Sequence, residues 1–256
     1  MKVVILAGGL GTRLSEETAR LPKPMVEIGG QPILWHIMKI FGHYGLTDFV
    51  ICLGYKGFVI KEYFSDFLLH RSDVTFDLEA GTQCYLQSRS EPWRVTLVDT
   101  GFDTMTGGRV RAVRDIIGDE TFCMTYGDGL SDVDIGALQQ HHRDNGKLAT
   151  VTAIRQPGRF GALRLDGASV DEMREKPVGE DNWINGGFFV LEPAVLDRVA
   201  GPGTIWEKEP LESLAHDGEL SAYRHEGFWQ PMDTLREKTM LENAWSTGQA
   251  PWKVWK

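Results

Sequence analysis

The chain has 256 residues, 42% of them hydrophobic and 25% charged, which is ordinary for a globular protein with a sizeable core. Its net charge of −9 argues against a general nucleic-acid-binding surface, because a duplex requires a basic face. The sequence starts directly on a strand pattern and contains no long apolar stretch, so we expect a cytoplasmic protein that binds no membrane. Cys52 and Cys123 fall in predicted strands, so core thiols are expected rather than metal ligands or a disulfide.

A glycine-rich loop follows the first predicted strand, residues 2–6. Its glycines lack the Cβ atoms that would keep a phosphate from the backbone, and the amide groups of such a loop form an anion-binding concavity. Arg13 adds a planar set of donors, and Lys23 adds a point charge. The prolines on both sides of Lys23 predict an extended, stiff segment. This stretch therefore predicts a polyphosphate-binding site.

Two commoner glycine-loop motifs do not match. A dinucleotide-binding loop needs a third glycine where this chain has Leu14, and an acidic residue after the second strand, where it has Gly54-Tyr55-Lys56. A Walker loop needs a glycine followed by Lys-Ser or Lys-Thr, and none occurs.

The first half alternates apolar runs with helical patterns. Helices are predicted at residues 31–41 and 58–69, and strands at 48–53, 94–98 and 121–126. This alternation predicts βαβ units and a parallel, Rossmann-like sheet. The stretch from 70 to 94 could be strands or loops.

Two further stretches of this half carry candidate site residues. A polar loop, residues 99–109, opens a helix and places Arg109 and Arg111 in its first turn, where basic residues oppose the helix dipole; this misfit suggests a role in anion binding. Asp128 stands between two glycines after a buried strand, which makes it a candidate Mg²⁺ ligand. Asp132 and Asp134 are expected to lie in the cap region of a helix at 135–144.

The second half predicts shorter, more antiparallel strands, at residues 149–155, 161–166, 169–175, 183–191 and 223–229, before a final helix at 234–247. From the residues alone, Asp233 is expected to cap that helix. The aromatic tail around Trp252 is expected to pack on the body or a partner subunit. The fold class is therefore α/β, a mainly parallel sheet flanked by helices, in a single domain of residues 1–256.

The pattern Leu-Ala-Gly-Gly-x-Gly-Thr-Arg-Leu at positions 6–14, followed by Pro-Lys-Pro at 22–24, resembles the signature of the sugar-1-phosphate nucleotidylyltransferases. Residues 14–18, 24–30, 125–129, 184–190 and 227–234 are similar to the branch of that family that uses CTP and glucose 1-phosphate. The resemblance covers nearly the whole chain. It implies that the domain has a nucleotide-binding part (about 1–130) and a more antiparallel sugar-phosphate-binding part (about 131–256). It implies an enzyme that makes CDP-glucose and pyrophosphate with the help of Mg²⁺, and a homo-oligomer.

The resemblance also implies roles for individual residues. The nucleotide site would consist of Leu6, Ala7, Gly8, Gly9, Leu10, Gly11, Thr12, Arg13, Lys23, Thr104, Arg109 and Asp128. The sugar-phosphate site would consist of Gly161, Glu175, Lys176, Asn185 and Gly186. Arg13, Lys23, Asp128 and Asp233 would be catalytic, and the two aspartates would hold the metal.

Three alternatives stay open at this point. The same chemistry could use UTP or dTTP, because base choice depends on loop contacts that the residues alone do not reveal. A second alternative keeps CTP but uses another phosphorylated acceptor. The third is a non-catalytic sugar-nucleotide sensor, which would be expected to lose Arg13, Lys23 or the aspartates. An activated glucose would feed deoxysugar or surface-polysaccharide synthesis.

Overall fold

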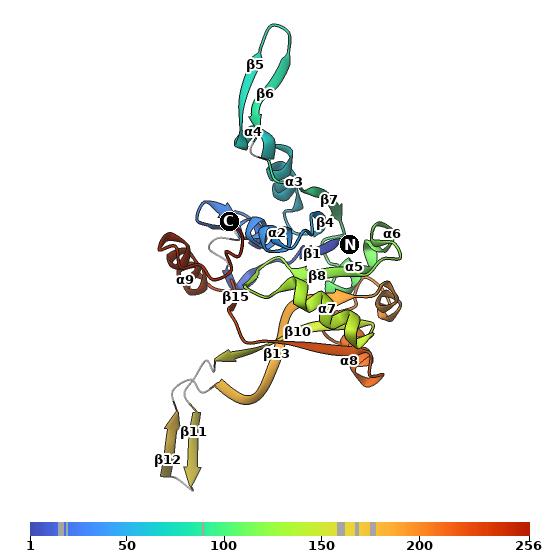
Figure 1. Cartoon of the computed structure of the whole chain (residues 1–256), viewed down its shortest axis with the longest axis vertical. Helices are drawn as coiled ribbons and strands as arrows, with labels where there is room; N and C mark the ends of the chain where they lie inside the picture. The colour runs from blue at the N-terminus through green and yellow to red at the C-terminus, as the bar shows by residue number, and fades with distance from the viewer. Residues whose placement is uncertain (15–17, 19, 89, 158–161, 167–168, 175–177) are drawn as a thin grey trace.

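The computed structural model in Figure 1 describes the chain except at residues 15–17, 19, 89, 158–161, 167–168 and 175–177. Among the described residues, seven strands form a central sheet in the order β14-β10-β13-β8-β1-β4-β7. The strands are β1 (Val3–Ala7), β4 (Asp48–Leu53), β7 (Arg94–Asp99), β8 (Phe122–Tyr126), β10 (Ala149–Pro157), β13 (Val178–Leu191) and β14 (Leu220–His225).

The sheet is mixed but mainly parallel. Strand β1 pairs in parallel with β4 and β8, and β4 pairs in parallel with β7. Strand β13 runs antiparallel to both of its neighbours, β8 and β10, while β14 is parallel to β10. The predicted α/β class is confirmed, including the parallel first half and the more antiparallel second half.

Helices cover both faces because the buried strands carry apolar side chains on both sides. On one face, Val3 and Ile5 of β1 pack with helices α2 (Ile33–His43), α3 (Gly57–Ser65), α7 (Ile135–Asn145) and α9 (Leu235–Ser246). On the other face, Val4 and Leu6 pack with α5 (Thr106–Ala112), α6 (Arg114–Ile117), η3 (Pro193–Arg198) and α8 (Glu209–His216). No helix in the described part of the chain is long and apolar enough to cross a membrane.

Several element boundaries differ from those predicted. Helix α2 begins at Ile33, because Gln31 and Pro32 form the short strand β3 (Gln31–Pro32) paired with β2 (Glu27–Ile28). The predicted helix 58–69 is broken at Asp66 into α3 and α4 (Phe67–Arg71). The expected last strand splits into β14 and β15 (Trp229–Pro231), and β15 leaves the central sheet to pair with β9 (Gly129–Ser131).

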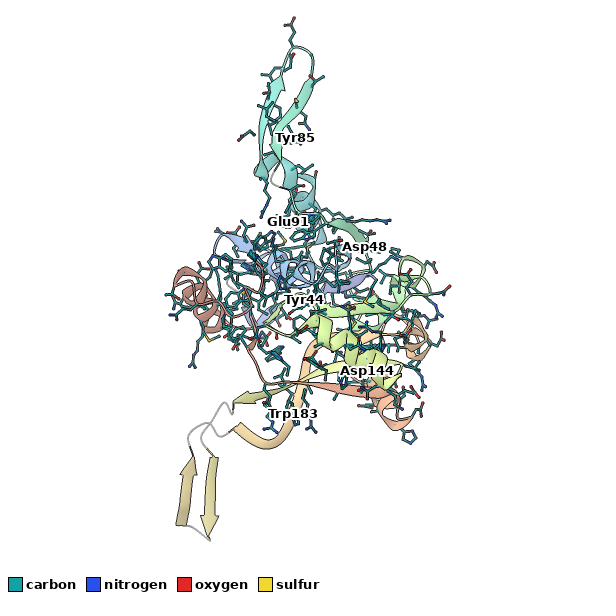
Figure 2. The ribbon with its side chains drawn as sticks, viewed as in Figure 1. Tyr44, Asp48, Tyr85, Glu91, Asp144 and Trp183 are labelled. Atoms are coloured by element: carbon teal, nitrogen blue, oxygen red, sulfur yellow. The ribbon has the colours of Figure 1, made fainter. Side chains whose placement is uncertain are left out.

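The β5–β6 and β11–β12 hairpins project away from the central sheet in Figure 1. The ambiguous stretch after residue 70 forms β5 (Ser72–Asp77) and β6 (Thr82–Ser88), an arm that exposes Phe76, Leu78 and Leu86. Figure 2 shows Tyr85 on this arm, away from the body of the protein. The second hairpin pairs β11 (Ala162–Asp166) with β12 (Ser169–Arg174).

The C-terminal tail packs against the body of the protein, which is one of the two arrangements predicted; the other was packing on a partner subunit. Trp252 is fully buried, and its indole Nε1 donates to Nδ1 of His36 at 3.3 Å. Nε2 of His36 donates to the carbonyl of Ile28 at 2.8 Å, so both ring nitrogens of the neutral imidazole are satisfied. Burial lowers the pKa of His36 to about 4. His36 is therefore a neutral core residue.

The two cysteines that were assigned to strands are core thiols. Cys52 and Cys123 are fully buried and not disulfide-bonded. Burial raises the pKa of each thiol to about 12, so neither is a reactive thiolate.

Candidate active site

A cavity of about 290 Å³ opens where the carboxyl ends of β1 and β8 meet beside α5. Ligands of open parallel sheets bind at such an edge. Its lining consists of Leu6, Ala7, Gly8, Gly9, Gly11, Lys23, Pro24, Thr104, Met105, Thr106, Arg109, Tyr126, Gly127 and Asp128. Most residues predicted for the nucleotide are therefore gathered in one place, although Leu10 and Thr12 are exposed and are not part of this lining.

Lys23 bridges two aspartates at one end of this cavity. Its Nζ lies 2.6 Å from Oδ2 of Asp128 and 2.6 Å from Oδ1 of Asp233. The lysine side chain is 11% exposed, and those of Asp128 and Asp233 are 32% and 21% exposed. A cation thus sits between two carboxylates that are 105 residues apart in the chain.

Backbone pairing holds these aspartates together. Gly129 of β9 is the register partner of Pro231 of β15, and the amide of Met232 donates to the carbonyl of Asp128 at 2.8 Å. Asp128 directly precedes Gly129, and Asp233 directly follows Met232, so the short β9–β15 ribbon sets the separation of the two aspartates. This explains why β15 leaves the central sheet.

The expectation that Asp233 caps the final helix is wrong. Thr234 is the N-cap of α9: its side chain accepts from the amide of Glu237, whose carboxylate accepts from the Thr234 amide. The same carboxylate accepts from the amide of Asp233 at 2.7 Å. Thr234 thus caps the helix, and the carboxylate of Asp233 contacts Lys23 instead. The other predicted cap is confirmed, since Asp134 accepts from the amide of Ala137 at 2.8 Å.

Lys23 is not in an extended segment, contrary to the prediction. It begins the single 3₁₀ turn η2 (Lys23–Met25), in which the amide of Met25 donates to the carbonyl of Pro22 at 2.8 Å. The turn returns the chain toward α2 and buries the lysine stem. Burial alone lowers the pKa of Lys23, but the charge of Asp128 and hydrogen bonds to both aspartates outweigh it and raise the pKa above 10.5.

The glycines of the loop serve different purposes. A Cβ on Gly8 would lie 2.3 Å from Cζ of Arg109, so Gly8 makes room for a side chain of the protein. Gly11 has a φ of +64°, which favours glycine. Gly9 has no atom within 4 Å of an added Cβ, so the backbone is open to a ligand there. Arg13 lies in η1 (Thr12–Leu14), but its side chain is outside the described part of the structure.

The prediction that Arg109 lies in the first turn of its helix is wrong. Helix α5 already begins at Thr106, because Gly107 and Gly108 belong to the helix and allow close contact with residues 202–206 rather than forming a loop. Arg109 therefore lies in the last turn, where a basic residue suits the dipole.

The guanidinium of Arg109 is engaged with the protein itself. Its donors contact Thr100 Oγ1 at 2.7 Å and four backbone carbonyls, those of Gly8, Leu53, Gly101 and Phe102, at 2.8–3.2 Å. Arg109 thus ties the glycine loop to the ends of β4 and β7 while one face of it lines the cavity. Thr104, the other residue expected in this loop, also lines the cavity.

Of the residues predicted for the sugar phosphate, Asn185 and Gly186 are described. Asn185 is exposed, and its Nδ2 lies 3.4 Å from the hydroxyl of Tyr126 in the cavity wall. Gly186 packs closely on β10, where an added Cβ would lie 2.9 Å from the carbonyl oxygen of Thr152. Gly161, Glu175 and Lys176 lie outside the described residues.

Sequence reasoning missed Thr106, Tyr126 and Glu207. Tyr126 and Thr106 line the cavity, and both of their hydroxyls donate to the carboxylate of Glu207. Tyr126 directly precedes Gly127-Asp128, so its position was a usable signal. Glu207 approaches from a loop before α8, and nothing local in the sequence marks it.

The family profile described as "Nucleotidyl transferase" matches residues 2–230, which is most of the chain. The chain belongs to this family. Among characterised relatives, it is 58% identical over all 256 residues to the glucose-1-phosphate cytidylyltransferase of Salmonella typhi, with complete coverage of both chains. It is 47% identical, again with complete coverage, to the probable glucose-1-phosphate cytidylyltransferase of Bacillus subtilis.

Solved structures agree at the level of the fold. HddC from Yersinia pseudotuberculosis aligns with a TM-score of 0.71 at 21% identity, covering 95% of this chain and 99% of the other. A putative glucose-1-phosphate thymidylyltransferase from Bacillus anthracis aligns with a TM-score of 0.69 at 19% identity, covering 100% and 98%.

The residues of this nucleotidyl transferase fit a divalent cation that arrives with a nucleotide. Asp128 and Asp233 already converge on one ammonium group, so their oxygens can converge on a metal ion. Within the described residues, no group of three or more His, Cys, Asp or Glu side chains is arranged to hold a metal. Two carboxylates suit Mg²⁺, which usually takes its remaining ligands from water and substrate phosphates.

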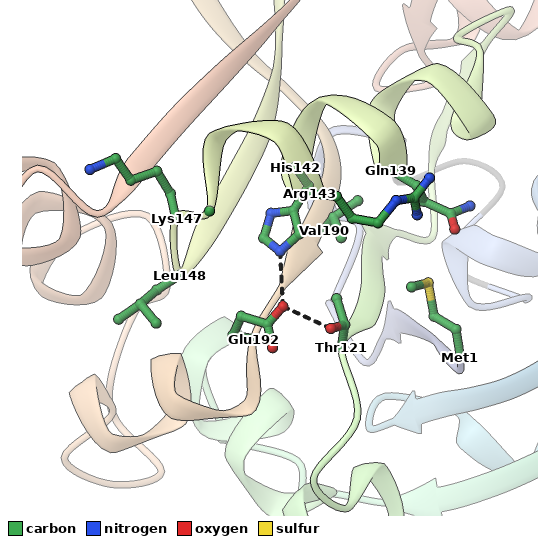
Figure 3. A pocket seen from close by; sticks show the side chains of 10 residues that line it. Met1, Thr121, Gln139, His142, Arg143, Lys147, Leu148, Val190 and Glu192 are labelled. Carbon is green, nitrogen blue, oxygen red and sulfur yellow. Dashed lines mark hydrogen bonds and ion pairs between the residues drawn. The ribbon is translucent and has the colours of Figure 1, made fainter.

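A cavity of about 330 Å³ elsewhere in the transferase has a different chemistry, shown in Figure 3. There the Glu192 carboxylate accepts from Thr121 and contacts Nε2 of His142 at 3.1 Å, and Nδ1 of His142 contacts Thr150 at 2.9 Å. These polar groups form hydrogen bonds with one another. Met1, at the N-terminus, also lines this cavity. Chemistry, rather than volume, identifies the cavity at Lys23 as the candidate active site.

Proposed function

We propose that this protein transfers the cytidylyl group of CTP to glucose 1-phosphate, giving CDP-glucose and pyrophosphate. The observation that carries the proposal is the placement of Lys23 between Asp128 and Asp233, beside a glycine loop at the end of β1. The full-length identity of 58% to a glucose-1-phosphate cytidylyltransferase supports the choice of CTP and of glucose 1-phosphate.

The triphosphate of CTP would lie along the glycine loop and Lys23. Gly9 leaves the backbone open there, so a phosphate can approach the amide groups of the loop. Arg13 is proposed to contact the β- and γ-phosphates. Arg109 acts on the nucleotide mainly by fixing the loop, since its donors already contact the carbonyls of Gly8 in the loop and of Leu53 at the end of β4.

In the reaction, a phosphate oxygen of glucose 1-phosphate attacks the α-phosphorus of CTP. The new P–O bond forms as the bond to the β-phosphate oxygen breaks, and pyrophosphate leaves. The attacking oxygen is already anionic, so no strong general base is required. Catalysis consists of bringing two anions together and stabilising charge around the α-phosphorus.

Lys23 suits this electrostatic task and not that of a base. Its pKa is raised by the two aspartates, so it remains an ammonium at neutral pH. Its Nζ lies at the cavity end where the carboxylates converge, and contact with a phosphate oxygen would exchange carboxylate partners for a phosphate partner.

Mg²⁺ is the metal that we propose for Asp128 and Asp233. When bound, it would supply charge neutralisation between the phosphates of the two substrates. The aspartates hold the cation, and the β9–β15 ribbon keeps their carboxylates together before any ligand arrives.

The acceptor would lie on the side of the cavity lined by Tyr126, whose hydroxyl contacts Asn185. Glu175, Lys176, Gly161 and Gly186 are proposed to complete the sugar-phosphate site, because a lysine suits the phosphate and a carboxylate suits sugar hydroxyls. In this division, residues 1–130 bind mainly the nucleotide and residues 131–256 mainly the acceptor.

A cytoplasmic homo-oligomer is proposed for the assembled enzyme. The β5–β6 arm supports self-association, because a two-stranded hairpin is marginally stable alone and this one exposes Phe76 at 53%, Leu78 at 91% and Leu86 at 64%. Light scattering coupled to gel filtration tests this directly, with a monomer as the contradicting result.

The function is tested by pyrophosphate release with Mg²⁺ and glucose 1-phosphate, with CTP, UTP, dTTP, ATP and GTP offered separately. We expect strong preference for CTP. Preference for UTP or dTTP would replace the proposed base. If none of the five nucleotides gives pyrophosphate release, the explanation would be another acceptor or a sugar-nucleotide sensor, and metal-dependent CTP binding would be measured next.

A further inference from the structure

The carboxylate of Glu207 lies behind the cavity wall and joins two of its residues. One oxygen accepts from the hydroxyl of Tyr126, and the other accepts from Thr106 Oγ1 at 2.7 Å. Both donors line the active-site cavity. A single carboxylate outside the cavity lining therefore accepts hydrogen bonds from two hydroxyl groups of the lining.

The fold fixes Glu207 through its own segment. The amide of Met105 donates to the carbonyl of Pro202 at 2.9 Å, and that of Gly108 donates to Thr204 at 3.2 Å. A Cβ on Gly108 would lie 2.4 Å from the carbonyl oxygen of Pro202, so this close contact with α5 needs glycine. Trp206, directly before Glu207, is fully buried. The carboxylate is thus held at one place relative to the cavity.

The direction of the hydrogen bonds is then determined. An ionised carboxylate only accepts, so the hydroxyl hydrogen of Tyr126 points to Glu207. The phenolic oxygen is left to accept from Nδ2 of Asn185. Oδ1 of Asn185 accepts from the amide of Gly187 at 2.8 Å, so the amide plane of Asn185 is fixed at both ends.

Tyr126 depends on Glu207 more than Thr106 does. Thr106 Oγ1 also accepts from the amide of Trp206 at 2.9 Å, which holds it in place without the carboxylate. The phenolic hydroxyl has Glu207 and the exposed Asn185 as its hydrogen-bond partners among the described residues. Loss of the carboxylate therefore frees the tyrosine hydroxyl and, with it, the orientation of Asn185.

We propose that Glu207 is a positioning residue for the phosphorylated sugar, acting through Tyr126 on Asn185. This inference rests on the proposed function, in which Asn185 contacts the sugar phosphate. The free N–H and the second lone pair of the Asn185 amide face the acceptor in a fixed direction, and Glu207 sets that direction from a distance. It touches neither substrate.

The test is a double-mutant cycle in steady-state kinetics with Glu207→Ala, Tyr126→Phe and the double variant. The phenylalanine removes one hydroxyl and keeps the ring, so it remains informative if Glu207→Ala does not fold. Each single variant is expected to raise KM for glucose 1-phosphate about tenfold while KM for CTP changes less than about twofold. The double variant is expected to match the single variants. Glu209→Ala, an exposed carboxylate two residues away in α8, is the control and should match wild type.

Three results would overturn the proposal: an unchanged KM for glucose 1-phosphate in Tyr126→Phe, additive effects in the double variant, or equal rises in KM for both substrates. Failure of the proposed function is distinguishable, because wild-type enzyme would then release no pyrophosphate from CTP and glucose 1-phosphate.

Discussion

Replacement of Lys23 by alanine is expected to have two opposite effects, a loss of turnover and a gain of metal affinity. In the ligand-free protein, the ammonium of Lys23 lies between the two carboxylates that we propose as metal ligands. A divalent ion must displace it from both. Replacement by alanine removes the cation that contacts both Asp128 and Asp233, so a divalent cation no longer has to displace it from these carboxylates.

The magnitude follows from the two contacts. A hydrogen bond to a charged group contributes about 1.5–3 kcal/mol, and the partly exposed aspartates place each contact near the lower end of that range. Two such contacts give about 3 kcal/mol, which corresponds to about a hundredfold difference in Kd. Loss of a preorganised charge at the reacting phosphate lowers kcat by about 10²–10³.

The assay is Mn²⁺ binding without nucleotide, followed by electron paramagnetic resonance, alongside pyrophosphate release. Lys23→Ala should bind Mn²⁺ about a hundredfold more tightly than wild type. Lys39→Ala is the control, because it removes a comparably buried ion pair, with Glu91 at 2.9 Å, outside the site. Addition of Asp128→Asn should abolish the gain. Unchanged Mn²⁺ affinity in Lys23→Ala, or turnover like wild type, would refute the reasoning.

Three further predictions concern the second aspartate, the loop and the core histidine. Asp233→Asn should lower kcat at least about a hundredfold and raise the Mg²⁺ concentration needed for half-maximal rate; an unchanged Mg²⁺ titration would contradict its role. Gly8→Ala should lower Tm, because the new Cβ would lie 2.3 Å from Cζ of Arg109, whereas Gly9→Ala should leave Tm unchanged and weaken CTP binding; similar Tm values for both would count against this. The pKa of His36 is about 4 in the folded state and about 6.5 unfolded, so its contribution to stability is complete above pH 6.5 and falls by about 3 kcal/mol as pH drops to 4. Denaturant unfolding of wild type and His36→Gln between these pH values should show that component only in wild type.

The site residues that belong to a recognisable local pattern could be predicted from the sequence. Gly9 and Lys23 were identified by their local pattern, and Asp128 by its place between glycines after a buried strand. The same pattern predicted the parallel half of the sheet, because apolar β-branched runs such as Val3–Ala7 report burial on both faces. These predictions needed no long-range information.

The rest depended on contacts between distant segments. Asp233 was expected from the residues alone to cap the final helix, and only the pairing of β15 with β9 shows that it lies beside Lys23 instead. Gly107 and Gly108 were interpreted as part of a loop. In the structure they belong to α5 and allow residues 202–206 to pack closely on it, so Arg109 lies in the last turn of the helix and not in the first. Glu207 could not be found, because its role exists only through that packing.

The central claim, transfer of a nucleotidyl group at the site of Lys23, Asp128 and Asp233, is tested most directly by phosphorus NMR of the complete reaction. The enzyme is incubated with CTP, glucose 1-phosphate and Mg²⁺, and all phosphorus species are followed. We predict loss of CTP and glucose 1-phosphate in equal amounts, with CDP-glucose and pyrophosphate formed one to one, and no reaction with Asp128→Asn. Release of inorganic phosphate, or of pyrophosphate while glucose 1-phosphate stays constant, would contradict the account.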